Sequence, residues 1–228
     1  MGCDPTGTMN SARLFYGDGA SRSGHVVPPV SVPGNPNQQM WFRGAASFDS
    51  ALDLLIKLGM NEAELIVFTG GSAGGLTVFL HLDHVAERMK TEAPNARVVG
   101  EPVCGFFADL PTDGYTPQNE SYPVRMNYVY NMQKAAPSLS TTCQAYYGSD
   151  AWKCIMAPHA FAFVSTPLFA LQSRFDTWQL GNVAQLPCNF ANSTGCTAAE
   201  WADIQAYGPT FMGQFAPYQT PDSKNGAL

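Results

Sequence analysis

Charged side chains are scarce in this sequence, and neither sign dominates strongly. They make up 13% of the 228 residues, against about 25% in an average soluble protein. Twelve basic and 18 acidic residues give a formal net charge of −6. Because proteins that bind nucleic acid neutralise phosphates with an excess of Lys and Arg, this balance argues against a nucleic-acid partner. Hydrophobic residues make up 45%, so the chain does not belong to the charge-rich disordered class either.

Long apolar runs and close cysteine pairs are also missing. No stretch of about 18 apolar residues occurs, so no membrane-spanning helix is expected. None of the six cysteines belongs to a Cys-x-x-Cys pair, which argues against a zinc site or thioredoxin-like chemistry. The length fits a single domain over residues 1–228. Glycine (21) and proline (17) are together more frequent than the average of about 12%, which predicts many turns and loops.

Four of the cysteines stand near one another in two places. Cys143 and Cys154 are close in sequence, as are Cys188 and Cys196, and both pairs stand in loop-like sequence. We therefore predict two disulfides, each closing a short loop, with unrelated free thiols as the alternative. Loops of this length are worth on the order of 3 kcal/mol of stability in the chain-entropy account of disulfides.

Two glycosylation sequences support the secretory route that the predicted disulfides suggest. Asn119 and Asn192 each begin an Asn-x-Ser/Thr triplet. The first residues contain no apolar signal core. They match a Met-Gly-x-x-x-Ser/Thr acylation pattern with Cys3 as a second lipid site, but we favour the interpretation that the natural protein begins earlier and a leader is missing. The pairing of Cys3 and Cys104 stays open.

Strand and helix patterns alternate along the chain. Helical periodicity covers residues 47–58, 76–89, 121–136 and 198–207, and apolar runs typical of buried strands cover 65–68, 97–100 and 168–172. Ser47 is the expected cap of the first helix. A capping box at Thr197 and Glu200 opens the last helix, which Gly208-Pro209 is expected to stop. Residues 1–46 are interpreted as loop with at most one short strand. The alternation predicts an α/β fold with a mostly parallel sheet and helices on both faces.

A serine stands at the centre of a glycine-rich segment. Residues 70–74, Gly-Gly-Ser-Ala-Gly, fit Gly-x-Ser-x-Gly, with a predicted strand before and a predicted helix after. This is the context of a nucleophile elbow, a sharp turn that lifts the Ser72 hydroxyl above the sheet. Small neighbours are expected there because backbone crowds backbone. The Ala73 N–H is the expected oxyanion donor. The alternatives are a structural turn and a phosphate loop, which lacks its Gly-Lys-Ser/Thr ending.

Asp176 is the best candidate for the acid that orients a catalytic base. Enzymes of the α/β-hydrolase class place Ser, then Asp or Glu, then His along the chain, and the acid follows a late strand. Residues 168–172 form such a strand, and the chain leads off its carboxyl end to Asp176. The acid would hold the imidazole tautomer and stabilise the imidazolium; a turn or capping aspartate is the alternative. Asp109, Asp113 and Asp150 do not follow a strand end in the same register.

No histidine follows Asp176. The four histidines are at positions 25, 81, 84 and 159, so the expected third member of the triad is absent. His81 is expected to pack beneath the site or hold a hydrogen bond, and His159 to be a loop residue. The spacing of His81 and His84 could suggest a metal site, but no arrangement of Asp or Glu supports one. We expect neither metal nor cofactor.

Eight short segments, spread over nearly the whole chain, match the sequence pattern of one protein family. They are Tyr16–Ser21, Phe42–Gly44, Leu55–Gly59, Thr69–Leu76, His81–Asp83, Gly105–Phe107, Thr166–Phe169 and Phe175–Gln179, together with the four paired cysteines. In aggregate they resemble the pectin acetylesterase family, which includes the Notum carboxylesterases. The resemblance implies a secreted serine carboxylesterase with an α/β-hydrolase fold and no cofactor. It matches Ser72 to the nucleophile and Asp176 to the acid, and implies an acylated polysaccharide as substrate.

The sequence departs from the family pattern at both ends. The family's glycine-rich oxyanion segment is not found; residues 17–20 are glycine-rich, but no predicted strand precedes them. The family's histidine, in a Cys-Phe-Ala-His-like segment, is not found either, and Val103-Cys104 stands where plant members have Asp. We therefore expect a partial sequence, nearly inactive by itself, whose base lies beyond residue 228. The alternatives are a non-catalytic binding protein on the same fold and a deacylase of protein-bound lipid.

Overall fold

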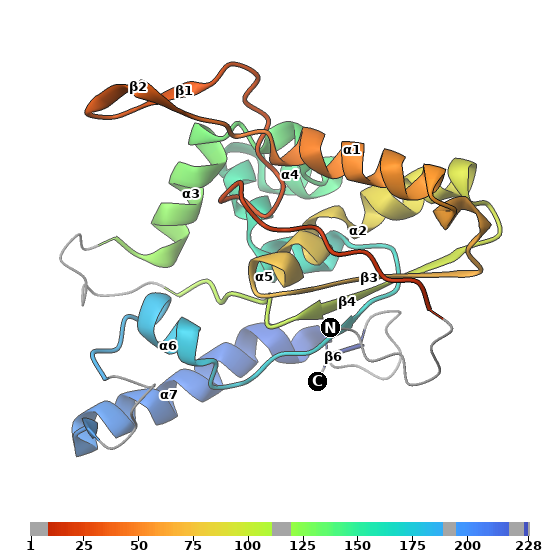
Figure 1. The fold of residues 1–228 in the computed structure, drawn as a ribbon. Helices are drawn as coiled ribbons and strands as arrows, with labels where there is room; N and C mark the ends of the chain where they lie inside the picture. Colours follow the sequence, from red (N-terminus) through yellow and green to blue (C-terminus); the bar gives the residue numbers. More distant parts are fainter. Residues whose placement is uncertain (1–8, 111–119, 189–194, 219–225, 228) are drawn as a thin grey trace.

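The computed structural model describes residues 9–110, 120–188, 195–218 and 226–227 (Figure 1). The predicted glycosylation sites at Asn119 and Asn192, and Cys3, lie outside these residues. Among the described residues, no helix is both long and apolar enough to cross a bilayer.

Among the described residues, four short strands pair in parallel, as two pairs joined by isolated bridges. They are β3 (Leu65–Gly71), β4 (Arg97–Val103), β5 (Phe169–Ala170) and β6 (Gly226–Ala227). β3 pairs with β4 over their full length, and β5 pairs with β6. Parallel bridges from Gly100 to Leu168 and from Val103 to Leu171 join β4 to the β5 segment. The strand order is therefore β3-β4-β5-β6, and the predicted parallel α/β arrangement is confirmed.

Two helices cover one face of this sheet. They are α1 (Gly44–Lys57) and α2 (Ala73–Glu92), which lie above β3 and β4 in Figure 1. Because side chains alternate along a strand, Ile66 and Phe68 point to this face and pack on the cluster around Phe48. The opposite face carries Leu65 and Phe169, each about half exposed (49% and 48%).

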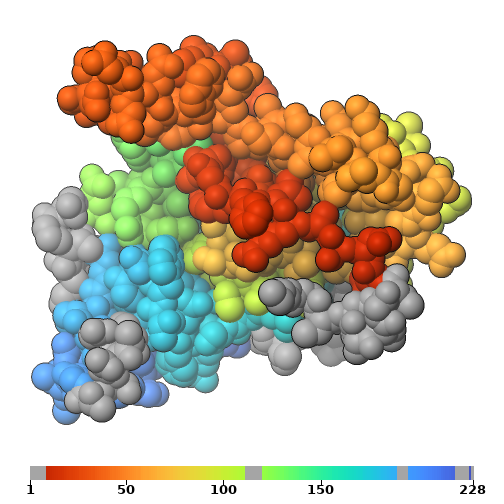
Figure 2. Space-filling view, viewed as in Figure 1, coloured from red at the N-terminus to blue at the C-terminus, as the bar shows by residue number. Residues whose placement is uncertain are grey.

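The other elements connect and flank this core. They are the hairpin strands β1 (Val30–Val32) and β2 (Asn35–Met40), the helices α3 (Tyr122–Met132), α4 (Thr141–Tyr147), α5 (Ala157–Ala160), α6 (Thr177–Asn182) and α7 (Ala198–Phe215), and the 3₁₀-helices η1 (Met60–Glu62), η2 (Ala136–Ser138), η3 (Gly148–Ile155), η4 (Phe161–Phe163) and η6 (Ala216–Tyr218). The β1–β2 hairpin projects from the body of the molecule (Figure 2). The described part of the N-terminal segment, residues 9–46, thus holds two strands where the sequence suggested a loop with one short strand.

Both predicted disulfides are present. Cys143 of α4 is bonded to Cys154 of η3, and Cys188 is bonded to Cys196 just before α7. Cys104 is a free, half-buried cysteine. The first bond therefore joins two short helical segments rather than the loop that the sequence suggested, and each bond closes a short stretch of chain.

Several helix ends differ from the prediction: α2 is longer at both ends, α3 ends at Met132, and two predicted end signals do not act as expected. α1 begins at Gly44, so Ser47 lies inside the helix instead of capping it. α7 continues through Gly208 and Pro209 to Phe215. A proline inside a helix removes one backbone hydrogen bond, but Phe211 and Phe215 beyond it are almost fully buried. Their burial outweighs the local stop signal.

Candidate active site

Ser72 occupies a strained turn between β3 and α2. Its backbone has φ 56° and ψ −122°, a region that residues with a side chain rarely adopt. Strain of this kind concentrates at functional sites. The Ser72 N–H donates to the Val103 carbonyl at 2.9 Å, and the Ser72 carbonyl accepts from the Leu76 N–H at 3.0 Å. The turn is therefore held at both ends, and the Ser72 residue is exposed, as predicted for a nucleophile elbow.

Some of the glycines around the turn are required by close backbone contacts. A Cβ atom at Gly70 would lie 2.5 Å from the Gly74 carbonyl oxygen, and one at Gly75 would lie 2.6 Å from the Val103 oxygen. At Gly71 and Gly74 an added Cβ would meet nothing within 4 Å. The predicted crowding of backbone against backbone is therefore found at Gly70 and Gly75. It is absent at Gly71 and Gly74, which flank Ser72-Ala73.

The sheet brings Asp176 to the same edge as Ser72. β3 ends at the serine turn, β4 ends beside it at Val103, and the Cys104 N–H donates to the Leu171 carbonyl at 2.8 Å. Asp176 follows Leu171 by five residues. Since the carboxyl ends of parallel strands share one edge, the serine and the carboxylate lie at that edge with β4 between their strands.

Asp176 is held as the N-cap of α6. Its Oδ1 accepts from the Gln179 N–H at 2.9 Å, and the residue is half-buried. The capping role weighed as the alternative for Asp176 is therefore real; it uses Oδ1 and fixes the position of the carboxylate.

Ala73 is the first residue of α2. The first N–H groups of a helix have no partner within the helix and carry its positive end. The geometry therefore fits the predicted oxyanion donor. No strand immediately precedes residues 17–20 in the part of the N-terminal segment that the structure describes, as expected from the sequence.

Three glutamine side chains, which the sequence analysis missed, fix the backbone that follows β4. Gln172 accepts from the Phe106 N–H at 3.0 Å. Gln179, with no exposed surface, donates to the Phe106 carbonyl at 3.0 Å and accepts from the Ala108 N–H at 2.9 Å. Gln214 pairs with both the N–H and the carbonyl of Asp109. The bonds of Gln179 tie the segment after β4 to α6, the helix that Asp176 begins, and those of Gln214 tie the same segment to α7.

None of the four histidines hydrogen bonds to Ser72 or Asp176 in the described chain. His84 pairs with Asp49 at 2.7 Å across α1 and α2. His81 is buried, and its Nε2 lies 3.0 Å from the Ser21 carbonyl and 3.1 Å from Ser23 Oγ. The prediction that His81 holds a hydrogen bond is confirmed. No group of three or more potential metal ligands occurs among the described residues.

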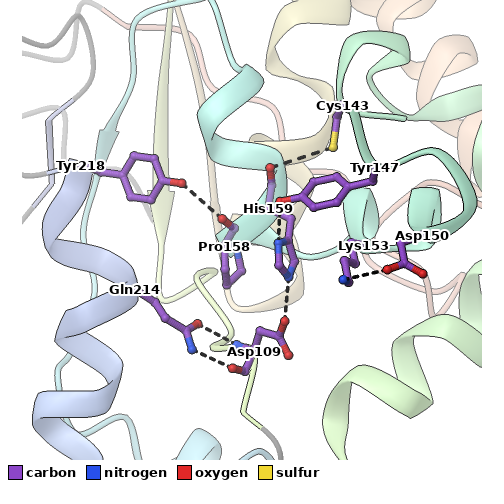
Figure 3. Close-up of polar contacts among 9 residues, drawn as sticks. All are labelled: Asp109, Cys143, Tyr147, Asp150, Lys153, Pro158, His159, Gln214 and Tyr218. Carbon is purple, nitrogen blue, oxygen red and sulfur yellow. Dashed lines mark hydrogen bonds and ion pairs between the residues drawn. The ribbon is translucent and has the colours of Figure 1, made fainter. Parts of the chain in front are cut away.

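His159 forms a hydrogen-bonded chain with two other side chains (Figure 3). Its Nε2 lies 2.7 Å from Asp109 Oδ2, and its Nδ1 lies 2.8 Å from the Tyr147 hydroxyl. Both ring nitrogens are therefore occupied, so this imidazole is not available as a base. The expectation that His159 is a loop residue was wrong: it lies in α5 and joins α4 to the segment after β4.

The buried imidazole of His81 predicts a stability that falls at acid pH. Burial lowers the pKa of His81 to about 4, whereas an unfolded histidine titrates near 6.5. The unfolded state therefore binds more protons between these values, and the free energy of unfolding should fall by about 3 kcal/mol as the pH drops from 7 to 4. Urea denaturation at both pH values measures this change.

The matched control for that measurement is the exposed histidine of the same helix. His81→Gln should remove most of the histidine contribution to the pH dependence of the free energy of unfolding. His84→Gln should retain that contribution, and both variants should retain the contribution of the carboxylates. Equal pH dependence in the two variants would contradict the buried, neutral state of His81.

Comparison with known proteins agrees with this geometry. A family model described as Pectinacetylesterase matches residues 7–227. The chain belongs to the pectinacetylesterase family. Pectin acetylesterase 11 of Arabidopsis thaliana is 26% identical over 225 residues, which cover 92% of this chain and 53% of that protein. Palmitoleoyl-protein carboxylesterase notum2 of Xenopus laevis is 25% identical over 177 residues, covering 75% of this chain and 35% of that protein.

A solved structure shows the fold. The Wnt deacylase Notum from Drosophila superposes with a TM-score of 0.76 at 22% identity, covering 92% of this chain and 56% of that chain. The fold of this pectinacetylesterase-family chain is therefore α/β-hydrolase-like. The chain thus spans about half the length of pectin acetylesterase 11 and of the Notum chain in that structure.

Proposed function

We propose that the protein is a serine carboxylesterase in which Ser72 is the nucleophile and Asp176 is the acid. The observation that carries the proposal is the strained φ of 56° at Ser72, at the end of a strand whose parallel neighbours lead to a capped, half-buried aspartate. Membership of a family of carboxylic ester hydrolases supports the reaction class.

The reaction would follow the two steps of an acyl-enzyme mechanism. Ser72 Oγ attacks the ester carbonyl carbon, and its proton passes to the base. The Ala73 N–H stabilises the oxyanion. The C–O bond to the alcohol breaks, the base returns the proton to the leaving oxygen, and water then hydrolyses the acyl-serine by the same steps. No cofactor is required by this sequence of events.

The base is the part of the site that the structure does not supply, because none of the four histidines hydrogen bonds to Ser72 or Asp176 among the described residues. His81 and His159 are engaged in the contacts described above, and His84 pairs with Asp49. The proposal therefore requires an imidazole other than these to meet Asp176. Loss of the base costs about 10⁶ in turnover in a well-studied serine protease, so the 228-residue chain alone should turn over very slowly.

Acetyl groups on a cell-wall-type polysaccharide are the substrate we propose. Pectin acetylesterases from Arabidopsis thaliana are among the relatives that match over more than nine-tenths of this chain. The two disulfides support an extracellular location. Deacylation of a protein-bound lipid is the second candidate, supported by the Notum relatives. Activity on p-nitrophenyl esters of increasing chain length separates the two, since the first requires a preference for acetyl.

Labelling with a fluorophosphonate tests the nucleophile directly. We expect the probe to modify Ser72, identified by peptide mass spectrometry, in this chain slowly and in any longer form of the protein rapidly. Ser72→Ala should abolish labelling, whereas Ser50→Ala, at a serine bonded to the Ala46 carbonyl in α1, should leave it unchanged. A protein that stays unlabelled in every form would favour the non-catalytic binding protein over the enzyme.

A further inference from the structure

Three aromatic side chains form a cluster beside Asp176. The rings of Phe107 and Trp178 are 5.2 Å apart, those of Tyr122 and Trp178 are 6.2 Å apart, and those of Phe107 and Tyr122 are 5.8 Å apart. The first two contacts are edge-to-face, which is a favourable geometry for aromatic pairs. We call these three residues the aromatic wall.

The aromatic wall stands at the sheet edge that carries the proposed site. Trp178 lies in the first turn of α6, the helix that Asp176 caps. Phe107 follows β4, the strand between those of Ser72 and Asp176. Gln179 bonds to the backbone on both sides of Phe107, at the Phe106 carbonyl and the Ala108 N–H. The wall is therefore fixed relative to the acid.

Only the outer member of the wall is open to solvent. Phe107 is 6% exposed and Tyr122 is 8% exposed, whereas Trp178 is 46% exposed. The inner pair supports the indole from behind and leaves part of it free. Neither of the two cavities described in the structure is lined by Trp178. An indole that is exposed on one side can stack on one face of a ring in a large substrate. It is less suited to an alkyl chain, which must be enclosed by apolar side chains to be removed from water.

The three side chains of the aromatic wall are largely apolar and carry no negative charge. Burial raises the pKa of Tyr122, so its hydroxyl stays neutral. The nearest cation in contact is Arg125, whose guanidinium lies 5.7 Å from the Tyr122 ring centre and donates to the Asn182 carbonyl. Its position is fixed by that contact.

We propose that the exposed indole of Trp178 binds a ring of the alcohol half of the ester, the part that leaves when Ser72 is acylated. The proposal rests on the proposed function. In a serine–base–acid system, the base that the acid orients also protonates the leaving oxygen. The leaving alcohol must therefore lie on the acid's side of the nucleophile, where Trp178, two residues from Asp176, presents an exposed aromatic ring.

Two organophosphates that differ only in the leaving group test this assignment. Diethyl p-nitrophenyl phosphate and diethyl fluorophosphate both place a diethylphosphoryl group on Ser72 Oγ, releasing p-nitrophenolate or fluoride. We expect Trp178→Ala to slow labelling by the p-nitrophenyl reagent five- to tenfold relative to the fluoride, as expected for loss of one aromatic contact. Trp178→Phe should restore the ratio to within about twofold. The matched control is Trp201→Ala, at a tryptophan of α7 that is 41% exposed, which should leave the ratio unchanged.

The outcomes distinguish the two proposals. If both reagents label Ser72 and Trp178→Ala leaves their ratio unchanged, the assignment of Trp178 is overturned while the nucleophile stands. If Trp178→Ala instead slows a long-alkyl fluorophosphonate and not the p-nitrophenyl reagent, Trp178 contacts the acyl side, and the assignment is also overturned. If neither reagent labels Ser72, the proposed function fails and the role of Trp178 fails with it.

Discussion

Asp176→Asn is expected to lower turnover of p-nitrophenyl acetate by about 10⁴-fold, the loss seen when the acid of a serine protease is replaced by its amide. The amide holds the wrong imidazole tautomer and carries no charge to stabilise the imidazolium. Asn is as good an N-cap as Asp, so the bond to the Gln179 N–H is preserved and the melting temperature should stay unchanged. The assay uses a form of the protein with Ser72-dependent turnover.

Asp176→Ala separates the two roles of this residue. It should lose the same activity and in addition about 1 kcal/mol of stability, because the α6 cap is removed. Asp109→Asn is the control among the other carboxylates weighed from the sequence, since Asp109 bonds to His159 and not to the serine turn. A large loss of turnover in Asp109→Asn with none in Asp176→Asn would reassign the acid.

The proposed nucleophile and acid could be found from the sequence because their signals are local. The turn at Ser72 needs a strand, a short glycine-rich segment and a helix in direct succession, and all three are readable within residues 65–92. The parallel sheet then places the carboxyl ends of successive strands at one edge. A carboxylate that follows the β5 segment can therefore be placed near that edge from the sequence alone. The disulfides were predictable for the same reason, since each closes a short loop.

Features that depend on distant packing could not be found in this way. Gly208 and Pro209 form a stop signal, yet α7 passes through them. A Cβ at Gly208 would lie 2.7 Å from the Phe175 ring, so the glycine lets α7 approach the residue before Asp176. Gly208 therefore permits a close contact and does not end the helix in a turn. Only the tertiary structure distinguishes these two roles of a glycine.

The glutamines around the segment after β4 show the same limitation. Gln179 and Gln214 come from different helices, and the latter is 105 residues from the Asp109 backbone to which it bonds. Nothing in the local pattern of α7 marks Gln214 as different from a solvent-facing polar residue. Backbone groups that leave a sheet must find partners when buried, but the sequence does not say which side chains provide them.

Gly105→Ala is expected to disrupt the serine turn and to cost about 4 kcal/mol or more, a size that marks a named packing conflict. The added Cβ would lie 2.2 Å from the Gly75 carbonyl carbon and 2.4 Å from the Leu76 nitrogen. Both are backbone atoms of α2, so no side-chain rotation relieves the contact, and either β4 or the start of α2 must move. Since the start of α2 fixes Ser72, labelling by the fluorophosphonate should be lost even at temperatures where the variant remains folded.

Two other glycines provide controls, one expected to stabilise the protein and one expected to leave its folding unchanged. Gly213 lies inside α7, where an added Cβ meets nothing within 4 Å; Gly213→Ala should therefore stabilise the protein by about 0.5–1 kcal/mol, as alanine does in helix interiors. Gly74→Ala, also without a neighbour within 4 Å, should fold normally although it alters the Gly-x-Ser-x-Gly motif. Thermal melts and labelling of the three variants check the argument together. If Gly74→Ala unfolds while Gly105→Ala does not, the motif glycine and not the contact between α2 and the end of β4 holds the nucleophile in place.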